Sequence, residues 1–400
     1  MIRTGIPTLD EQLKGGIPIG KTLVYYCAPG SSGDVFGIQT VYANLAEGGV
    51  CYYVASNCSP DVVRSSFREY GWDLAPHASR LAIVDGYSAQ LGIPSTEPFV
   101  IDDPGSIDSI HSAISRIIET LSPGDVIAFQ SLSAIFDGCA GAGTTLQQIL
   151  DRVKGWNKMA VLNGGVVIYN FTDRGYDRRI AEQVKNGLCN ATVLIGEAGG
   201  RQLYGSYFRL HTCDWARPPE WPTPYKVLKP GGVRVYIPKI LVTGPRAAGK
   251  STFVRTASLL SSGKAVSVDR AGTTVALDYA HLTLRGFTID VFGTPGQDRF
   301  NPILKTLARD AMGVILVVDS TDPRGFERAA EISRITIGKA TPYIIAANKQ
   351  DSADAMEPDA VRKRMDAPQN VPVIGVCALD PASVLLALET LIGKIIGGVK

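Results

Sequence analysis

The chain has 400 residues, of which 45% are hydrophobic, and its formal net charge at pH 7 is only +2. A chain of this length suits two domains that each bury a core of their own. The near-neutral charge gives no strong signal for nucleic acid or an acidic membrane surface, and no apolar run is long enough to span a bilayer. The seven cysteines form no C-x-x-C pair, so neither a disulfide framework nor a zinc site is expected. With no secretory signal apparent, we expect a cytoplasmic protein.

Strand-like and helix-like segments alternate through about the first 236 residues, which predicts a parallel sheet flanked by helices. The predicted strands are 22–27, 50–55, 81–85, 126–129, 166–169 and 191–195, and the predicted helices are 35–46, 60–70, 106–121 and 145–162. Short β-like pieces separated by proline and glycine follow over 201–236. We expect these pieces to close the sheet as antiparallel strands.

The beginning of the chain carries a family signature. Residues 4–10 read TGIPTLD, residues 15–18 read GGIP, and the similarity continues through GWDL at 71–74 and DGYS at 85–88. These stretches resemble the RecA-like ATPases of the KaiC/GvpD group, and the resemblance fades over about the first 235 residues. Members of that group bind ATP between the subunits of a ring and often serve as regulators. The resemblance therefore implies a RecA-like domain through which the chain could form a homo-oligomer.

The segment that aligns with the phosphate loop of this family lacks the residues that bind phosphate and Mg²⁺. In residues 28–35, Asp34 stands where the family has the phosphate-binding lysine, and Val35 replaces the hydroxyl that ligates Mg²⁺. A carboxylate at that position would repel the β- and γ-phosphates, and valine offers no oxygen. Asp34 could also serve simply as a favourable acid in the first turn of the next helix, and the two interpretations are compatible.

Two further positions of the family's ATP site have also changed. Gln130 follows the strand at 126–129, where the family has the aspartate that orients Mg²⁺ and its water. Ser56 and Asn57 replace the acidic residues that would polarise the attacking water. Changes at four separate places predict a site that no longer turns over ATP.

A second and complete phosphate loop begins almost without a linker after the first domain. Residues 240–242 predict a buried strand, residues 244–251 read GPRAAGKS, and residues 252–255 open a helix. This is the setting in which G-x-x-x-x-G-K-[ST] binds phosphate through loop amides and a helix N-terminus. Lys250 would reach the β- and γ-phosphates, and Ser251 would ligate Mg²⁺. The predicted phosphate-binding residues are Gly244, Arg246, Ala247, Ala248, Gly249, Lys250, Ser251 and Thr252.

Further segments follow at the ends of predicted strands. They are TTVALDY at 273–279, DVFGTPGQ at 290–297, AANKQD at 346–351 and CAL at 377–379, and the apolar run at 313–320 predicts a central strand. Each pattern alone is common. Their order places a ligand at the carboxyl edge of a doubly wound sheet.

Residues 238–400 resemble a small Ras-like GTPase, and the sequences TTVALDY and TPGQDRF are most similar to those of the prokaryotic group related to MglA. The resemblance implies GTP or GDP with Mg²⁺ as ligands. Thr274 would contact Mg²⁺ and the γ-phosphate, with Thr273 as an alternative one residue away. The Gly296 amide would touch the γ-phosphate, and Gln297 would orient the hydrolytic water. The predicted catalytic residues are therefore Gln297, Lys250 and Thr274, and the predicted metal ligands are Ser251 and Thr274.

The resemblance also assigns the guanine base. Asp351 would accept hydrogen bonds from N1 and N2 of the ring, and Asn348 would contact the base edge. The stem of Lys349 would lie over the ring. A backbone amide within Cys377, Ala378 and Leu379 would meet O6.

Two positions depart from the Ras-like pattern. Most members have aspartate before the threonine of D-T-x-G-Q, whereas this chain has Gly293. Asp290 cannot simply substitute, because alternation along a strand points it to the opposite face, so we expect weaker Mg²⁺ binding and slow turnover. Arg246, at the third loop position, could fold onto the γ-phosphate as a finger. The alternative, which we favour, is that Arg246 points to solvent or blocks a partner's finger.

The predicted fold class is α/β, with two P-loop NTPase-type domains whose parallel sheets are flanked by helices. Residues 1–237 would form a RecA/KaiC-like domain with a degenerate nucleotide site, and residues 238–400 a Ras-like GTPase. The apolar stripe over 384–396 predicts a last helix packed on the GTPase sheet rather than on a membrane surface, which would require a basic polar face.

The predicted function is a regulatory GTP switch that hydrolyses GTP slowly, with an ATPase-dead first domain as scaffold or effector. Regulatory protein partners, such as activating or exchange factors, would act on it. The alternative is a non-enzymatic oligomeric assembly or transcription-regulatory protein with structural GTP. A DNA-handling ATPase is disfavoured by the missing lysine, the missing acids and the low net charge.

Overall fold

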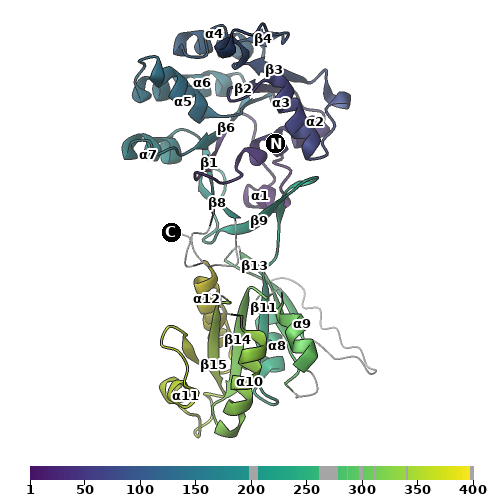
Figure 1. Cartoon of the computed structure of the whole chain (residues 1–400), viewed down its shortest axis with the longest axis vertical. Coiled ribbons are helices and arrows are strands. Elements are labelled where there is room, and N and C mark those ends of the chain that lie inside the picture. Colours follow the sequence, from purple (N-terminus) through teal and green to yellow (C-terminus); the bar gives the residue numbers. More distant parts are fainter. Residues whose placement is uncertain are drawn as a thin grey trace. The chain divides into compact units, whose positions relative to one another are not determined.

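The computed structural model describes residues 1–197, 206–260, 278–285, 287–296, 301–309, 311–338 and 341–396. These residues form two compact units (Figure 1). The first unit comprises Met1–Glu197 with Ser206–Tyr236, and the second begins at Ile237. Each unit is built on one mostly parallel sheet flanked by helices, which confirms the α/β class with two domains of the P-loop NTPase type.

The first unit contains a sheet of ten strands in the order β10-β9-β8-β7-β1-β6-β5-β2-β3-β4. The strands are β1 (Thr22–Cys27), β2 (Cys51–Ala55), β3 (Leu81–Asp85), β4 (Phe99–Val100), β5 (Val126–Phe129), β6 (Val166–Thr172), β7 (Ala191–Glu197), β8 (Ser206–Cys213), β9 (Thr223–Leu228) and β10 (Gly232–Val235). In this order, the seven strands from β7 to β4 pair in parallel. Strands β8, β9 and β10 are joined to the sheet by antiparallel pairing. The expected antiparallel closure of the sheet is therefore present.

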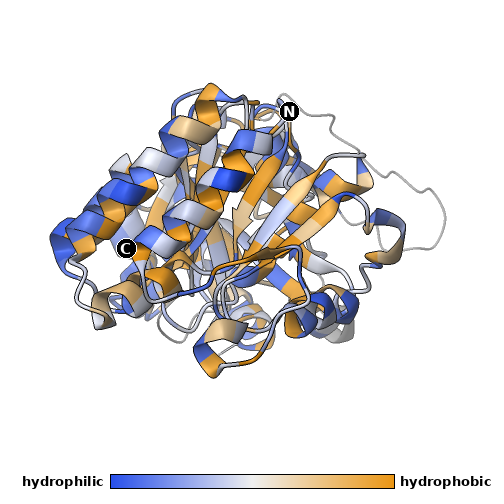
Figure 2. Ribbon diagram, turned by 90° about the horizontal axis from the view of Figure 1, so that it is seen from above, coloured by the Kyte–Doolittle hydropathy of each residue, from blue (hydrophilic) through white to orange (hydrophobic). Residues whose placement is uncertain are grey.

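Helices cover both faces of this sheet (Figure 1). They are α1 (Pro7–Gln12), α2 (Asp34–Ala46), α3 (Pro60–Glu69), α4 (Ile107–Thr120), α5 (Leu132–Gly141), α6 (Leu146–Leu162) and α7 (Arg178–Gly187). Side chains alternate along the central strand β1, so Leu23 and Tyr25 join the core beneath α1 to α3, and Val24 and Tyr26 join the core beneath α4 to α7. In Figure 2 the strands are mostly coloured as apolar, whereas the outer sides of the helices are hydrophilic. A strand buried on both faces is expected to be apolar throughout, as β1 is.

Sequence patterns missed helices α1, α5 and α7. Helix α5 begins behind Ser131, whose hydroxyl accepts a hydrogen bond from the Ala134 amide, but Gly138 and Gly141 lower its intrinsic helix propensity. Packing compensates, because Leu132, Ile135 and Phe136 are buried against the sheet. Tertiary burial thus decided a segment in which local propensity was weak.

The second unit contains a sheet of six strands among the described residues, in the order β12-β13-β11-β14-β15-β16. The strands are β11 (Lys239–Thr243), β12 (Tyr279–Leu284), β13 (Phe287–Gly293), β14 (Gly313–Asp319), β15 (Tyr343–Asn348) and β16 (Val373–Val376). The helices are α8 (Lys250–Ser258), α9 (Asn301–Ala308), α10 (Phe326–Thr336), α11 (Pro358–Arg364) and α12 (Pro381–Ile396). Only the β12–β13 pair is antiparallel. The carboxyl ends of β11, β14 and β15 therefore meet at one edge.

Helix α12 packs on this sheet, as its apolar stripe predicts. It contacts β14, β15, β16 and α8. Its buried residues include Val384, Leu388, Leu391 and Ile395. Within the described ranges, none of the helices is long and apolar enough to cross a membrane.

Replacing Leu388 with alanine should destabilise the second unit. The side chain is fully buried, and removing it should lower the free energy of local unfolding by about 2–5 kcal/mol. Hydrogen exchange of peptides covering β14 and β15 measures this loss. Leu386→Ala is the matched control on the same helix, because Leu386 is 54% exposed and its loss should cost under about 0.5 kcal/mol. Equal effects of the two substitutions would contradict the packing described here.

Candidate functional site

The loop between β11 and α8 requires glycine at both ends. Gly244 has φ = 146°, and a Cβ there would lie 2.0 Å from the carbonyl oxygen of Val317 in β14. Gly249 has φ = 96°, and a Cβ there would lie 2.1 Å from Nδ2 of Asn348. Both the positive φ and the close approach exclude a side chain. The loop is thus held tightly against the ends of the two neighbouring strands.

Lys250 begins α8 and folds back toward this loop. Its side chain is only 8% exposed, and Nζ donates a hydrogen bond to the Pro245 carbonyl oxygen at 2.5 Å. Burial lowers the pKa of Lys250 to about 8, an effect opposed by the nearby Asp278 carboxylate. The amine therefore lies inside the loop, in a partly desolvated environment where an added anion would interact strongly with it.

The side-chain amide of Asn348 joins the phosphate loop to the last predicted motif. Nδ2 donates to the Ala248 carbonyl oxygen at 2.7 Å, and Oδ1 accepts from the Ala378 amide at 2.8 Å. Asn348 is 2% exposed. The Ala378 carbonyl oxygen in turn accepts from Thr256 Oγ1 of α8 at 2.6 Å. Asn348 thus acts here as a brace between two loops, and both ends of its amide are engaged within the protein.

The other predicted base-binding residues lie beside this brace. Lys349 has φ = 69°, and its Nζ lies 2.5 Å from Asp319 Oδ2. Asp351 is exposed, Cys377 is half-buried, and Leu379 is 72% exposed. A carboxylate and an apolar side chain are therefore accessible beside Asn348. Such an arrangement suits a flat ring, with one group to accept from its edge and apolar surface against its face.

Asp278 is a functional candidate that sequence patterns missed. It lies directly before β12, opposite Gly293 at the end of β13, and the Gly293 amide donates to the Asp278 carbonyl oxygen at 2.8 Å. A Cβ built on Gly293 would lie 3.0 Å from Asp278 Cβ and 3.1 Å from its Oδ2. The Asp278 carboxylate therefore occupies the space where an aspartate at position 293 would begin. Only the strand pairing reveals this, since the two residues are far apart in sequence.

Asp290 is excluded from this role, as strand alternation predicts. Its Oδ1 accepts a hydrogen bond from the Tyr279 hydroxyl at 2.8 Å and lies 2.8 Å from His281 Nδ1. Burial alternates along β13, with Val291 and Gly293 on the buried side and Asp290 on the other. The Asp290 carboxylate thus belongs to the opposite face of the hairpin.

The predicted catalytic residues Thr274 and Gln297 lie outside the described residues. Gly296 is described, and a Cβ there would lie 2.6 Å from the Arg246 amide nitrogen. This glycine therefore contacts the phosphate loop directly. The side chain of Arg246 is exposed, as are Ala247 and Ser251, whereas Ala248 is buried and Thr252 is half-buried.

The first unit has a different arrangement at the corresponding edge. Val35 is fully buried in the core and Asp34 is exposed in the first turn of α2. Gln130 Oε1 accepts from the backbone amides of Ser56 and Asn57, at 3.1 and 3.0 Å. The amide of Gln130 therefore connects the ends of β5 and β2 through hydrogen bonds within the protein.

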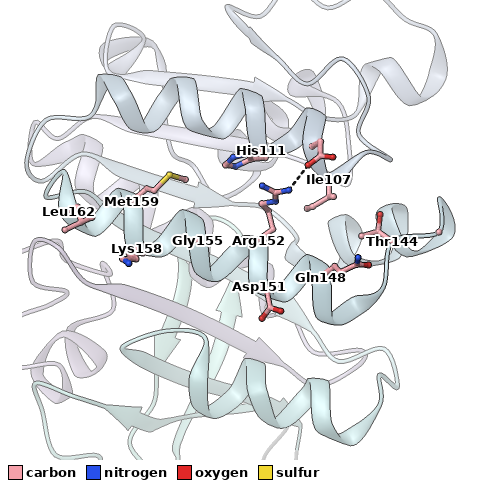
Figure 3. Close-up of a pocket in the computed structure, with 12 residues that line it drawn as sticks. Ile107, His111, Thr144, Gln148, Asp151, Arg152, Gly155, Lys158, Met159 and Leu162 are labelled. Carbon is pink, nitrogen blue, oxygen red and sulfur yellow. Dashed lines mark hydrogen bonds and ion pairs between the residues drawn. The ribbon is translucent and has the colours of Figure 1, made fainter.

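A groove of about 910 Å³ lies on a helical face of the first unit. Figure 3 shows its lining side chains along α4 and α6, including His111 and Arg152, with an ion pair between Arg152 and Asp108. None of the predicted site residues lines it. Ligands of open α/β sheets bind at the carboxyl ends of strands, and this groove lies elsewhere.

Comparison with known proteins supports two domains of different kinds. Residues 2–191 match the sequence model of the KaiC ATPase family, and residues 233–394 match that of the ADP-ribosylation factor family. The first half is thus a KaiC-like ATPase domain, and the second is a small GTPase domain, a class that binds guanine nucleotides and typically Mg²⁺. The predicted resemblances to KaiC-like ATPases and to small Ras-like GTPases are confirmed.

Individual relatives share part of the chain. A UPF0273 protein of Aeropyrum pernix is 26% identical over 191 residues, which are 47% of this chain and 75% of that protein. A UPF0273 protein of Sulfurisphaera tokodaii is 30% identical over 34% of this chain. The chain spans about half the length of that protein and of several other curated relatives. A KaiC-like protein of Pyrococcus horikoshii has a similar structure over 59% of this chain and 98% of its own, with 18% identity and a TM-score of 0.46.

Binding of a nucleoside diphosphate should add a proton to Lys250. Phosphate charges beside the amine favour its protonated form, so a pKa that starts near 8 should rise on binding. At about pH 8, Lys250 should take up about half a proton per nucleotide bound. This uptake should fall toward zero near about pH 6.5, where the amine is already protonated. Calorimetry of GDP binding in buffers of different ionisation enthalpy measures it. Lys250→Arg should abolish this component, because a guanidinium stays charged; unchanged uptake in that variant would assign the proton to another group.

Proposed function

We propose that this chain, which joins a KaiC-like ATPase domain to a small GTPase domain of the ADP-ribosylation factor family, is a guanine-nucleotide switch. The second domain, from residue 238, would bind GTP and hydrolyse it slowly to GDP. The first domain, residues 1–237, would serve as an ATPase-dead scaffold or effector. Regulatory proteins that activate hydrolysis or exchange would set the state of the switch.

The observation that carries this proposal is the Asn348 brace between the phosphate loop and the Ala378 loop. It supports the proposal because it joins a loop suited to phosphates to a surface suited to a purine at one strand edge. Asp351 would then read N1 and N2 of guanine, and Lys349 and Leu379 would flank the ring. Since the Ala378 amide is bonded to Asn348, we assign the contact with O6 to the neighbouring amide of Leu379.

The residues present suit a magnesium ion bound together with the nucleotide. Mg²⁺ is usually held by one or two protein oxygens, substrate phosphates and water. Among the described residues no cluster of three or more metal-ligating side chains exists, and this class of site requires none. Ser251 would supply a hydroxyl and Asp278 would orient a metal-bound water, with Thr274 as a further predicted ligand. When bound, Mg²⁺ neutralises charge on the β- and γ-phosphates.

The first domain is proposed to be inactive toward ATP. Asp34 presents a carboxylate where phosphate would bind, and the buried Val35 offers no oxygen. The Gln130 amide already bonds the two backbone amides of Ser56 and Asn57, so acids are replaced by neutral groups that satisfy each other. Such a domain can still assemble or receive a signal, because its core does not depend on nucleotide.

Counting the nucleotide bound to the purified full-length chain tests this proposal. We expect about one guanine nucleotide per chain and no adenine nucleotide, because only the second phosphate loop is complete. Lys250→Ala should reduce GDP affinity by at least about 100-fold, since a buried charge contact to phosphate is lost. Mass spectrometry of the released nucleotide and equilibrium binding of GDP provide the measurements. Asp34→Ala is the control and should leave guanine binding unchanged.

Bound ATP that survives Lys250→Ala would refute the inactive first domain. Hydrolysis separates the switch from the alternative, an assembly or regulatory protein with structural GTP. Detectable turnover that is lost in Gln297→Leu supports the switch, because glutamine is assigned the hydrolytic water. Bound GTP that never turns over in the unaltered chain would favour the alternative.

Moving the carboxylate from position 278 to position 293 on the paired strand should preserve magnesium binding. Asp278→Gly should increase the Mg²⁺ concentration needed to slow GDP release by about tenfold, as expected for losing one oriented contact. The double variant Asp278→Gly with Gly293→Asp should recover most of that loss, because the two residues occupy one space on paired strands. GDP release measured across a magnesium titration reports both effects.

Asp290→Asn is the matched control on β13, because that carboxylate belongs to the opposite face. It should leave the magnesium titration unchanged. A double variant no better than Asp278→Gly alone would contradict the assigned role.

A further inference from the structure

We propose that Asp319 is a positioning residue for guanine binding, which fixes the Lys349 side chain as one wall of the base pocket. This inference rests on the proposed binding of guanine nucleotides. Asp319 is the last residue of β14 and pairs with Asn348 of the parallel strand β15. Its Oδ2 lies 2.5 Å from Lys349 Nζ. Neither sequence pattern nor family resemblance pointed to Asp319.

The carboxylate of Asp319 is itself held in place. Its Oδ1 accepts hydrogen bonds from the Thr321 amide at 3.0 Å and from Thr321 Oγ1 at 2.6 Å. The Asp319 side chain is 17% exposed and that of Lys349 is 40% exposed. Although burial acts to raise it, hydrogen bonds from Lys349 and Thr321 hold the pKa of Asp319 below its ordinary value. Both oxygens of the charged Asp319 carboxylate are thus engaged, Oδ1 by Thr321 and Oδ2 by Lys349, and the contact with Thr321 of its own loop sets its orientation.

Hydrogen bonds also join the segments on either side of the Asp319–Lys349 pair. Ser320 Oγ donates to the Asn348 carbonyl oxygen, and Gln350 Nε2 donates to Ser320 Oγ and to the Met356 carbonyl oxygen, both at 3.0 Å. The Met356 amide donates to the Ser320 carbonyl oxygen at 2.9 Å. Ser320, in the loop after β14, is therefore hydrogen-bonded to the segment that begins at Asn348 and contains Lys349. Asp319 is positioned relative to Lys349 by this network and not by the ion pair alone.

A lysine stem makes a poor wall unless its end is held. The side chain has a flexible four-carbon stem, and a ring that packs against a free stem would have to immobilise it on binding. Here the ammonium is bound by Asp319, and the Lys349 carbonyl oxygen accepts a hydrogen bond from the Ser352 amide at 3.0 Å, so both ends of the stem are held. The ring can then pack on methylene groups that are already ordered, which lowers the cost of binding.

The same loop contains a matched control. Asp322 lies three residues after Asp319 and pairs with Arg324 at 2.8 Å. Arg324 is 90% exposed, and this pair makes none of the bonds that join the loop to Asn348 or Lys349. Asp322→Asn therefore removes an equivalent charge from the same loop without releasing Lys349.

Release of GDP from the full-length chain tests the inference. Asp319→Asn should accelerate release about three- to tenfold, as expected for loss of a partly shielded charged hydrogen bond, whereas Asp322→Asn should change it less than about twofold. In a Lys349→Met background, Asp319→Asn should have almost no further effect, because methionine has no ammonium to hold. Release of inosine diphosphate, which lacks the 2-amino group, should accelerate by the same factor, since the wall contacts the ring face and not its edge.

Asp319→Glu keeps the charge and should restore release to within about twofold of the unaltered chain. The inference is overturned if Asp319→Asn is equally harmful in the Lys349→Met background, or if it matches Asp322→Asn. Failure of the unaltered chain to bind GDP would instead refute the proposed function. The two failures are therefore distinguishable in one set of measurements.

Discussion

The second domain depends on one buried amide. Asn348 donates to the phosphate loop through Ala248 and accepts from the Ala378 loop. Because Asn348 is buried, losing either partner would leave a polar group unsatisfied, at a cost of about 1–3 kcal/mol. The brace therefore fixes the separation of the loops assigned to phosphate and to base. In the proposed function, the phosphates and the base of one nucleotide would span these two loops.

Charges around the brace are placed by strand pairing. Asp278 fills the space that Gly293 leaves open on the adjacent strand, and Asp319 reaches Lys349 from the end of β14. In both cases a carboxylate acts beside a motif residue to which it is not adjacent in sequence. Strand pairing allows this, because residues opposite each other, such as Asp278 and Gly293, lie close together on one face, and Asp319 lies opposite Asn348, the residue before Lys349.

The two domains have similar folds but different side chains at the corresponding sheet edge. In the second domain the loop before α8 keeps a partly desolvated lysine beneath it. In the first, Asp34 is exposed, Val35 is buried and Gln130 satisfies neighbouring amides. Hydrogen bonds among neutral groups stabilise that edge without a ligand. This contrast is what we would expect if the first domain keeps its sheet and core without using ATP, as proposed above.

The sequence by itself determined the architecture and the kind of ligand. Apolar runs predicted strands β1, β3 and β5 at their observed bounds, since a strand buried on both faces must be apolar along its length. The loop motifs predict the phosphate and base segments, because the chemistry requires certain residue types in a fixed order. Helix α5 was missed, because packing and not propensity stabilises a segment with two glycines.

Only the tertiary structure decided which side chains act together. The opposition of Asp278 and Gly293, the bonds of Asn348 and the pairing of Asp319 with Lys349 all join residues from different strands and loops. Register across a sheet is set by the face that each strand buries and by the connecting turns, so the residues that meet are seen only when the strands are paired. Motifs thus predict where a nucleotide would bind, whereas the folded sheet shows which side chains lie together at that edge.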